Sequence, residues 1–564
     1  MSKLKRGSLF NSVPAPKVGR TAFDMSFEHK LTCDMGKLIP AFCMECLPGD
    51  TLDIKPSALF RLQALISPMM QRVDASMLFF KEPYRHIWEG FEDFMTGGSD
   101  GLQKPEPPYF TLQDIFNLNP ASQTIPEQLQ VGSLLDYLGI PLPYELKNGA
   151  WTPSTITGSD KAKLSVTKLS ALPLRAYAHI WNEYFRDQTL QDEIPFETTS
   201  GHISSTELQA LLVLQSRCWK KDYFTSALPT PQRGPDVKIN LAQTVTLGEN
   251  SSIRLTSPSF GTDGQVTGLN PLSLNGSGTS KPGTLDAAGR EVTSITGSAN
   301  NSVIDLSEAS AVTIVALRTA FKLQQFLERN NVAGGRYIES VLAHFGVKSS
   351  DARLQRPQFL GGGHIPIVIS EIETNADSTG ENNNVVGDLA GKGKAFGTLG
   401  HVKTFCEEHC FCIGLLSIIP VASYSQGISR MWTRFDKFDY YWPEMQFVGE
   451  QAIKQRELYF NYKMTQLDPN QEWAQDFGYT PRYAEYKYNH DRVSGDMRTS
   501  LSYWHMGRLF DKKPVLNSDF LTCKPTDRIY AVSDVATSQH VVADIWYDVT
   551  AVRKMAKYGT PKMS

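Results

Sequence analysis

The stretch "HVVADIWYDVTAV", residues 540–552, decides the fold because it is a strand at the far end of the chain. Its apolar and polar residues alternate, which is typical of a strand with one face buried. Phe23, Met25 and Phe27 alternate with polar residues in the same way near the other end. A sheet built from both ends would be one long-range fold, so we expect a single β architecture and not a row of independent domains.

Other segments agree with a mainly β protein that carries helical insertions. The runs "IPIVISEI" (residues 365–372) and "CFCIGLLSI" (residues 410–418) are apolar enough for further strands. The 42 glycines and 32 prolines favour many turns. Apolar residues at helical spacing predict three helices, at residues 177–185, 314–327 and 337–345.

Residues 237–310 have a different character. This segment is rich in Ser, Thr, Gly and Asn, and Phe260 is its only aromatic residue. Its short alternating runs of Val, Ile and Leu predict an exposed β module with too few large residues for a core of its own. We therefore expect a surface insertion. The predicted parts are residues 1–22 (basic arm), 23–236 (first part of the β fold), 237–310 (insertion), 311–552 (remainder of the β fold) and 553–564 (basic tail).

The charge is uneven along the chain. The net charge is −3, which disfavours a protein whose whole surface binds nucleic acid. Residues 1–23 and the residues after Asp548 nevertheless contain basic side chains and no acid. Such ends suggest that one face or cavity meets an anion, and the alternative is that they are merely solvated tails.

The sequence contains no signal for export or membrane insertion that we recognise. The start, "MSKLKRGSLFNSVPAP", lacks an apolar central region. The longest apolar stretch, "FCIGLLSIIPVA" (residues 411–422), is too short to span a bilayer and contains a proline. We therefore expect a soluble protein made in a cytoplasm, with its eight cysteines reduced.

Motifs for catalysis are incomplete. In "GDLAGKGKAFG" (residues 387–397) the glycines are one residue too close for a phosphate loop, and no Ser or Thr follows either lysine. The run "LGGGH" (residues 360–364) precedes a predicted strand and does not join a strand to a helix. We expect no enzymatic activity.

One segment could hold a metal ion. "HVKTFCEEHCFC" (residues 401–412) offers soft sulfur and imidazole ligands for zinc, with Cys43 and Cys46 as a second pair. The alternative is that Cys410 and Cys412 are small buried residues of a strand. We favour this alternative and expect no metal or cofactor, because neither cluster has the paired spacing of a structural zinc module. The candidate ligands in the segment are His401, Cys406, His409, Cys410 and Cys412.

Two segments are rich in aromatic residues. "GYTPRYAEYKYNHDRVSGDMR" (residues 478–498) mixes tyrosines with cations, as a platform for single-stranded nucleic acid does. Its acids partly cancel these cations, and in an extended chain Tyr486 and Tyr488 would lie opposite Lys487, so we favour a structural seam. "MWTRFDKFDYYWPEM" (residues 431–445) suits either a subunit interface or the core. The candidate interface or core aromatics are Trp432, Tyr440, Tyr441, Trp442, Tyr483, Tyr486 and Tyr488.

Several long phrases resemble the major capsid proteins of gokushoviruses, which belong to the Microviridae. The resemblance spans nearly the whole chain and is weakest over residues 237–310. It is carried by "FDMSFEHKLTCDMGKLIPAFCMECLPGD" (23–50), "PYRHIWEGFEDFMTGG" (83–98), "RYIESVLAHFGVKSSDARLQRPQFLGG" (336–362), "GISRMWTRFDKFDYYWPEMQFVGEQ" (427–451), residues 478–498 and "SYWHMGRLF" (502–510).

The resemblance implies an eight-stranded antiparallel jelly roll with long loops and helical insertions. It implies a T=1 icosahedral shell around a circular single-stranded DNA genome, assembled in a bacterial cytoplasm. Residues 237–310 would form threefold contacts and meet a bacterial surface receptor. A small basic DNA-binding peptide and scaffolding and pilot proteins would be further partners. The basic residues expected to face DNA are Lys3, Lys5, Arg6, Lys17, Arg20, Arg553, Lys554 and Lys557.

Two other classes of protein remain as alternatives. A carbohydrate-binding or carbohydrate-active β protein would also be rich in aromatic residues, but its enzymatic form needs a paired acid and base that the sequence does not reveal. A nucleic-acid-binding protein outside a capsid is disfavoured by the net charge of −3.

Overall fold

The computed structural model describes residues 19–118, 125–147, 149–154, 156, 163–235, 237, 255–260, 266–272, 314–334, 336–348, 350–373, 389–462, 474–531 and 539–558. The chain forms two compact units, one of residues Gln232–Arg329 and one of all the rest. The described part of the predicted insertion contains an antiparallel strand pair, β10 (Leu255–Phe260) with β11 (Val266–Leu272). Lys3, Lys5, Arg6 and Lys17 lie outside the described residues.

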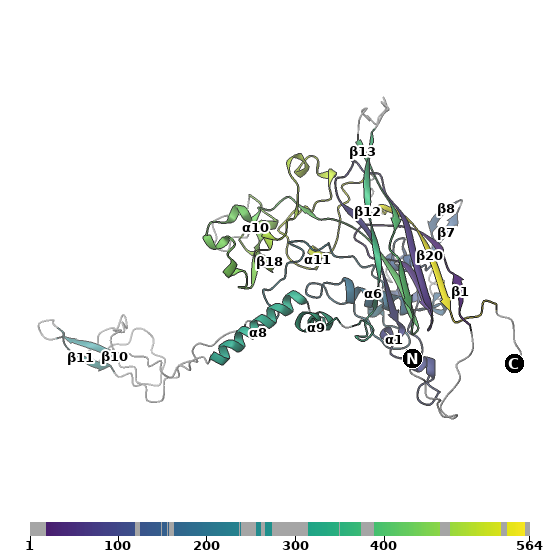
Figure 1. The fold of residues 1–564 in the computed structure, drawn as a ribbon, viewed down its shortest axis with the longest axis horizontal. Coiled ribbons are helices and arrows are strands. Elements are labelled where there is room, and N and C mark those ends of the chain that lie inside the picture. Colours follow the sequence, from purple (N-terminus) through teal and green to yellow (C-terminus); the bar gives the residue numbers. More distant parts are fainter. Residues whose placement is uncertain are drawn as a thin grey trace. The chain divides into compact units, whose positions relative to one another are not determined.

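Ten strands form one large sheet, and all its pairings are antiparallel (Figure 1). The order is β1-β20-β4-β13-β12-β5-β15-β3, while β2 also pairs with β20 and β14 with β4. The ten strands thus occupy eight positions across the sheet. Their bounds are β1 (Thr21–Asp24), β2 (Phe27–Cys33), β3 (Ile39–Cys46), β4 (Thr51–Leu62), β5 (Val73–Pro83), β12 (Gln358–Glu373), β13 (Leu389–Thr398), β14 (Val402–Phe405), β15 (Cys410–Pro420) and β20 (Val541–Arg553).

The two ends of the chain meet in this sheet, as the alternation predicts. Strand β20 pairs with β1 and β2 on one side and with β4 on the other. The strand expected through Phe23 and Phe27 is divided between β1 and β2. Ser26 causes the break, because its main-chain N–H and its hydroxyl both donate to Asp24 while the hydroxyl also accepts from the N–H of Val549.

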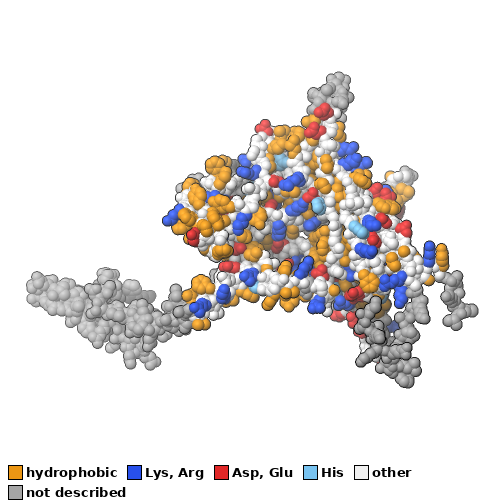
Figure 2. All heavy atoms as spheres, viewed as in Figure 1, with side chains coloured by type: hydrophobic (Ala, Val, Ile, Leu, Met, Phe, Trp, Pro, Cys, Tyr) orange, Lys and Arg blue, Asp and Glu red, His pale blue; other side chains and the backbone are white. Residues whose placement is uncertain are grey.

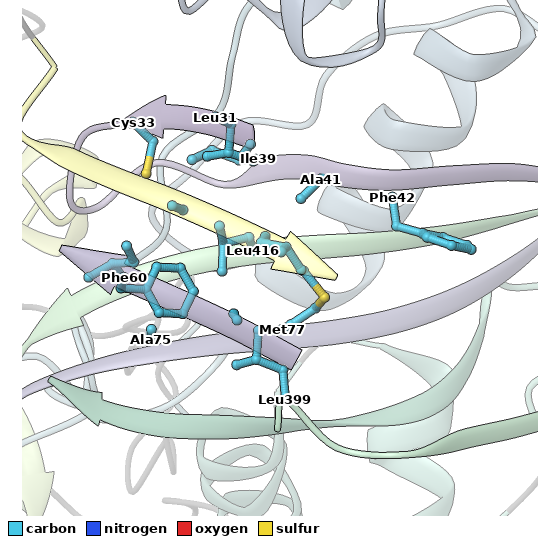
Figure 3. Packing of buried hydrophobic residues seen from close by; sticks show 14 of the residues in the cluster. Leu31, Cys33, Ile39, Ala41, Phe42, Phe60, Ala75, Met77, Leu399 and Leu416 are labelled. Carbon is cyan, nitrogen blue, oxygen red and sulfur yellow. The ribbon is translucent and has the colours of Figure 1, made fainter. Parts of the chain in front are cut away.

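The sheet curls so that its two ends face each other. The ring of Tyr547 on β20 lies 5.1 Å from that of Phe42 on β3, although these strands are near opposite ends of the sheet order. The Tyr547 hydroxyl also donates to the carbonyl oxygen of Ala41 at 3.0 Å. The space enclosed by the curl is a large apolar core, in which Leu31, Met77 and other side chains from different strands gather (Figure 3). The mainly β, antiparallel fold of jelly-roll type is therefore confirmed.

Helices cover the outer face of one half of the sheet. Strand β15 is buried on both faces, because Phe411, Ile413 and Leu415 pack outward into a second apolar core with Trp88 and Tyr177. The helices of this region are α1 (Tyr84–Ile87), α2 (Phe91–Thr96), α3 (Leu112–Asn117), α4 (Leu134–Tyr137), α6 (Leu172–Ile180) and α7 (Ser205–Leu211).

The three helices expected from the sequence are confirmed. Helix α6 has Pro173 in its first turn and continues as a π-helical turn, Trp181–Phe185. The other two are α8 (Ile314–Ala333) and α9 (Tyr337–Phe345). We expected the "LGGGH" run to precede a strand, which is wrong, because the run lies inside β12. Within the described residues, no helix combines the length and apolar character needed to cross a bilayer.

A third apolar core supports the long connections between β15 and β20. It joins Trp219 and Phe224 to Phe477 and Phe520 from later segments of the chain. The short elements around it are β16 (Ser423–Tyr424), β17 (Glu450–Lys454), α10 (Gln455–Leu458), β18 (Asp476–Pro481), β19 (Asp491–Arg492) and α11 (Ser518–Leu521). The remaining short pairs are β6 (Tyr109–Thr111) with β9 (Lys168–Ser170) and β7 (Tyr144–Lys147) with β8 (Ala150–Pro153).

Candidate assembly and genome-facing surfaces

Residues 431–448, which we call the aromatic loop, form an exposed connection between β16 and β17. Asp439 accepts hydrogen bonds from the main-chain N–H groups of Asp436 and Phe435, both at 2.9 Å. These bonds hold the pKa of Asp439 below its ordinary value. The loop is therefore shaped by polar turns and not by burial of its aromatic rings. Its single turns of 3-10 helix are Arg430–Thr433, Lys437–Asp439 and Pro443–Met445.

The large apolar side chains of the aromatic loop are open to solvent. Trp432 is 70% exposed, Phe435 91% and Phe447 88%. Figure 2 shows hydrophobic side chains gathered on the lobe that Figure 1 labels α10 and β18. The aromatic loop directly precedes β17 and α10 in the chain. Large apolar side chains concentrated on one exposed region mark a surface that another molecule covers.

The base of the aromatic loop is a network of charges around Glu485. The guanidinium of Arg434 lies 3.0 Å from Oε1 of Glu485, and Nε2 of Gln451 donates to Oε2 at 2.6 Å. Arg430 lies 3.8 Å from Glu485 and 3.6 Å from Glu457. Burial raises the pKa of Glu457. The network joins the aromatic loop to residues 478–498, a connection that sequence spacing did not reveal.

Tyr483 is the packed centre of residues 478–498. Its backbone is left-handed (φ 63°) and a 3-10 turn, Ala484–Tyr486, follows, so the extended chain that we expected here is wrong. The Tyr483 hydroxyl donates to the carbonyl oxygen of Tyr440 and accepts from the N–H of Trp442, each at 3.3 Å. The Tyr441 ring meets the Tyr483 ring edge-on at 5.0 Å. This strained backbone conformation places the Tyr483 side chain between residues 478–498 and the aromatic loop, where it joins the two segments.

The candidate aromatics divide by exposure. Tyr483 is 3% exposed and belongs to the subunit's own packing. The others are between 45% and 70% exposed, so they are free to contact another molecule. They are Trp432, Tyr440, Tyr441, Trp442, Tyr486 and Tyr488. Tyr486 also carries the Arg434 guanidinium 4.3 Å above its ring, which occupies one of its faces.

The bases of the two basic ends lie side by side at one edge of the sheet. Thr21 on β1 is the register partner of Arg553 on β20. Arg20 is therefore adjacent to the start of the C-terminal tail, where Lys554 and Lys557 are exposed. Arg553 already has partners within the subunit. Its Nε lies 3.0 Å from Oδ2 of the buried Asp50, and its guanidinium also donates a hydrogen bond to the carbonyl oxygen of Glu45 at 3.0 Å.

Comparison with known proteins matches nearly the whole chain to one family. The family described as "Capsid protein (F protein)" matches residues 11–141 and 148–563. The chain belongs to this phage capsid protein family. Capsid protein VP1 of Chlamydia phage 1 is 32% identical over 614 aligned residues, which cover 98% of this chain and 97% of the relative. Capsid protein VP1 of Bdellovibrio phage phiMH2K is 31% identical with the same coverages, and that of Spiroplasma virus 4 is 28% identical with coverages of 100% and 98%.

The chain is thus a major capsid protein of the Microviridae type, and its resemblance to gokushovirus capsid proteins is confirmed. Capsid proteins of this family are structural proteins that assemble with copies of themselves, and they are not enzymes. Their place is the virion. The comparisons give no support to the carbohydrate-binding or carbohydrate-active alternative.

The structure of the capsid protein brings together only part of the segment 401–412, for which the sequence favoured buried strand cysteines over a zinc site. The sulfurs of Cys46, Cys406 and Cys410 lie within 4.8 Å of one another, and all three side chains are buried. His401 instead pairs with Asp53 at 2.8 Å, and the ring of His409 packs against Phe91. Cys410 and Cys412 are completely buried on β15, as the alternative interpretation required, and Cys43 is exposed.

A second cluster of potential metal ligands escaped the sequence analysis. Glu82, His86 and His179 place one ligand atom each within 4.8 Å of the others. The spacing of Glu82 and His86 by four residues gave no usable signal, because Glu82 is on strand β5 and only His86 is on helix α1. His179 is distant in sequence, and only the packing of α6 against the end of β5 brings it to the pair.

Proposed function

We propose that this capsid protein assembles into a T=1 icosahedral shell that encloses a circular single-stranded DNA genome. Assembly takes place in the bacterial host cytoplasm, with scaffolding and pilot proteins as partners. The observation that carries this proposal is the aromatic loop, which exposes Trp432, Phe435 and Phe447 on a base of buried ion pairs. A preformed surface of this kind loses little conformational entropy when a neighbouring subunit covers it.

A closed shell needs heterologous contacts, in which two different surfaces of the same chain meet and the rotation between copies closes a ring. The aromatic loop supplies one such surface because its large rings bury much area with few rotatable bonds. Its exposed side chains are flanked by Lys437 and Glu444, so the surface also carries the polar groups typical of an interface rim.

The test replaces Trp432 by glutamate in particles produced with the complete set of virion proteins. We expect loss of closed shells in electron microscopy and a shift to slowly sedimenting subunits, because burying a charge at an interface is costly. The subunit itself should melt like the wild type, since Trp432 is 70% exposed. Trp432→Phe is the matched control and should assemble. Normal shells from Trp432→Glu would remove the aromatic loop from the assembly surface.

The proposal for the genome rests on the two adjacent basic ends. Arg20, Lys554 and Lys557 place positive charge at the edge where β1 begins and β20 ends. Residues 1–19 carry four more cations. We propose that these ends face inward and neutralise phosphates together with a small basic virion peptide. Arg553 contributes less than the others because Asp50 already pairs with it.

The test for genome contact keeps the arm's length and removes its charge. Replacing Lys3, Lys5, Arg6, Lys17 and Arg20 by glutamine should lower the salt concentration at which particles release DNA. For single strands the slope of log affinity against log salt falls by about 0.7 for each phosphate that the protein no longer neutralises. Equal DNA retention across the salt titration would show that the arm does not hold the genome.

The insertion, residues 237–310, is proposed to form threefold contacts and to meet a bacterial surface receptor. Support comes from its polar composition and from its separation as part of the compact unit Gln232–Arg329. Particles that lack residues 256–298 should assemble but fail to adsorb to host cells. Normal adsorption by such particles would exclude this segment as the attachment site.

A further inference from the structure

A buried carboxylate lies between two imidazoles behind the main sheet. Glu82 is near the end of β5, His86 is on α1 and His179 is on α6. Oε1 of Glu82 lies 2.9 Å from Nδ1 of His179 and 3.3 Å from Nδ1 of His86. Ligand atoms around a tetrahedral zinc ion with bonds of about 2.0–2.1 Å are separated by about 3.4 Å. The three side chains are therefore already near the spacing of a metal site.

These side chains have polar atoms that the protein leaves unsatisfied. The side chain of Glu82 is fully buried, and those of His86 and His179 are 3% and 16% exposed. Oε2 of Glu82 and both ring nitrogens of His86, Nδ1 and Nε2, find no hydrogen-bond partner among the described residues. Each buried polar group without a partner is unfavourable, so Oε2 of Glu82 and Nδ1 of His86, the ring nitrogen that faces this carboxylate, point to a ligand between the two side chains.

A polar cavity gives access to the cluster. It has a volume of about 360 Å³ and is lined by Arg85, His86, Glu89, Glu92, His179 and Gln355. The charge of Arg85 is balanced by Glu408, whose Oε2 is 2.7 Å from Nε of Arg85. Glu89 and Glu92 are exposed acids, so the cavity favours a cation. It also has room for a water molecule as a further ligand.

We propose that Glu82, His86 and His179 bind a divalent transition-metal ion of the zinc class. Two imidazoles and one carboxylate suit Zn²⁺, whereas Ca²⁺ and Mg²⁺ prefer sites built from oxygen ligands. Such an ion connects the end of β5 to α6, and so ties the helical layer to the sheet. Its role is structural, because it would fasten a subunit that must survive in the virion.

The experiment uses purified virions or the intact subunit, stripped with EDTA and dialysed against metal-free buffer. Adding zinc chloride should give stoichiometric bound zinc by mass spectrometry and raise the thermal midpoint by several degrees, whereas magnesium chloride should not. His86→Ala and Glu82→Gln should lose both effects. His202→Ala is the matched control, because His202 also pairs with a carboxylate, Asp114 at 2.8 Å, but belongs to no cluster of three ligands within the described residues.

The thiol cluster of Cys46, Cys406 and Cys410 could also take up zinc, so it is removed separately. Cys406→Ser should keep the bound zinc and the thermal shift. Loss of zinc in Cys406→Ser with retention in His86→Ala would overturn the proposal.

Cobalt substitution in the wild-type protein gives an answer that does not depend on any variant. A visible spectrum without thiolate charge-transfer bands supports the Glu82 site, whereas strong thiolate bands contradict it. Absence of zinc uptake also contradicts it.

Discussion

Replacing Glu485 by alanine tests whether buried charge holds the aromatic loop in place. The change removes the acceptor of Arg434 at 3.0 Å and of Gln451 at 2.6 Å, and it removes the negative charge 3.8 Å from Arg430. The side chains of Glu485 and Arg434 are 13% and 10% exposed, so water reaches the orphaned guanidinium poorly. Breaking a buried pair costs about 3–5 kcal/mol, and the remaining exposure lowers our expectation to about 2–4 kcal/mol.

This cost should appear as local opening of the loop, because the apolar cores of the sheet are elsewhere. Hydrogen exchange followed by mass spectrometry on peptides from residues 430–450 measures it. A loss of about 2–4 kcal/mol corresponds to exchange faster by a factor of about 30–800, at tenfold for about each 1.4 kcal/mol. Peptides from β20 should keep their protection. The looser loop should also assemble poorly, since its ordering would then oppose each subunit contact.

Two variants control for this prediction. Glu444→Ala removes an exposed acid of the same loop and should leave exchange unchanged. Glu485→Gln keeps an acceptor of the same shape and should have a smaller effect than alanine. Unchanged exchange in Glu485→Ala would refute the reasoning. Equal acceleration in the loop and in β20 would refute it too, because it would mean that the whole subunit had unfolded.

Two further predictions concern the helical layer and its neighbours. Arg175→Met should lower the free energy of unfolding of the subunit by about 3–5 kcal/mol. The reason is that Glu207, which lies 3.0 Å from Arg175 and is 5% exposed, loses its charged partner. Urea titrations followed by tryptophan fluorescence measure this loss. Asp187 should make the subunit sensitive to acid. Burial alone would raise the pKa of Asp187, but Lys221 at 2.9 Å holds this pKa below its ordinary value. The ionised Asp187 therefore adds to the free energy of unfolding above the unfolded pKa of about 3.9, and this gain is lost as the pH falls through the lower folded pKa. Asp187→Asn should make the free energy of unfolding depend less on pH in this acidic range.

The parts of the fold that the sequence predicts are those governed by local periodicity. The alternation at residues 540–552 predicts β20 to within one residue, and Pro173 correctly marks the start of α6. The break at Ser26 was not predictable, because it depends on a hydrogen bond from the N–H of Val549 at the other end of the chain. A periodic pattern records which face is buried, but it contains no information on such distant partners.

The glycines of β12 show the same limit. A Cβ on Gly362 would overlap the carbonyl oxygen of Met77 on the neighbouring strand, and one on Gly363 would overlap the main chain of Gly400. The run is glycine because backbones approach closely there, which a lone sequence cannot distinguish from a loop. Tyr483 is similar, since its left-handed backbone is maintained by Tyr440 and Trp442. The candidate site was therefore predictable in its composition and not in its geometry.

The distribution of exposed apolar residues follows from how the sheet is covered. The half formed by β5, β15 and β3 has helices on its outer face, and its curled inner face is filled by the large core. The other half leaves Trp546, Phe396 and Val368 open on its outer face, at 50%, 75% and 65% exposure. A capsid subunit must pair with copies of itself through surfaces that stay exposed after the subunit has folded. Within the described residues, the aromatic loop and this open half of the sheet are exposed apolar surfaces that we propose for this pairing. The first is a loop on an ion-paired base and the second is a strand face. Two unlike surfaces on one chain are what a heterologous, ring-closing contact requires.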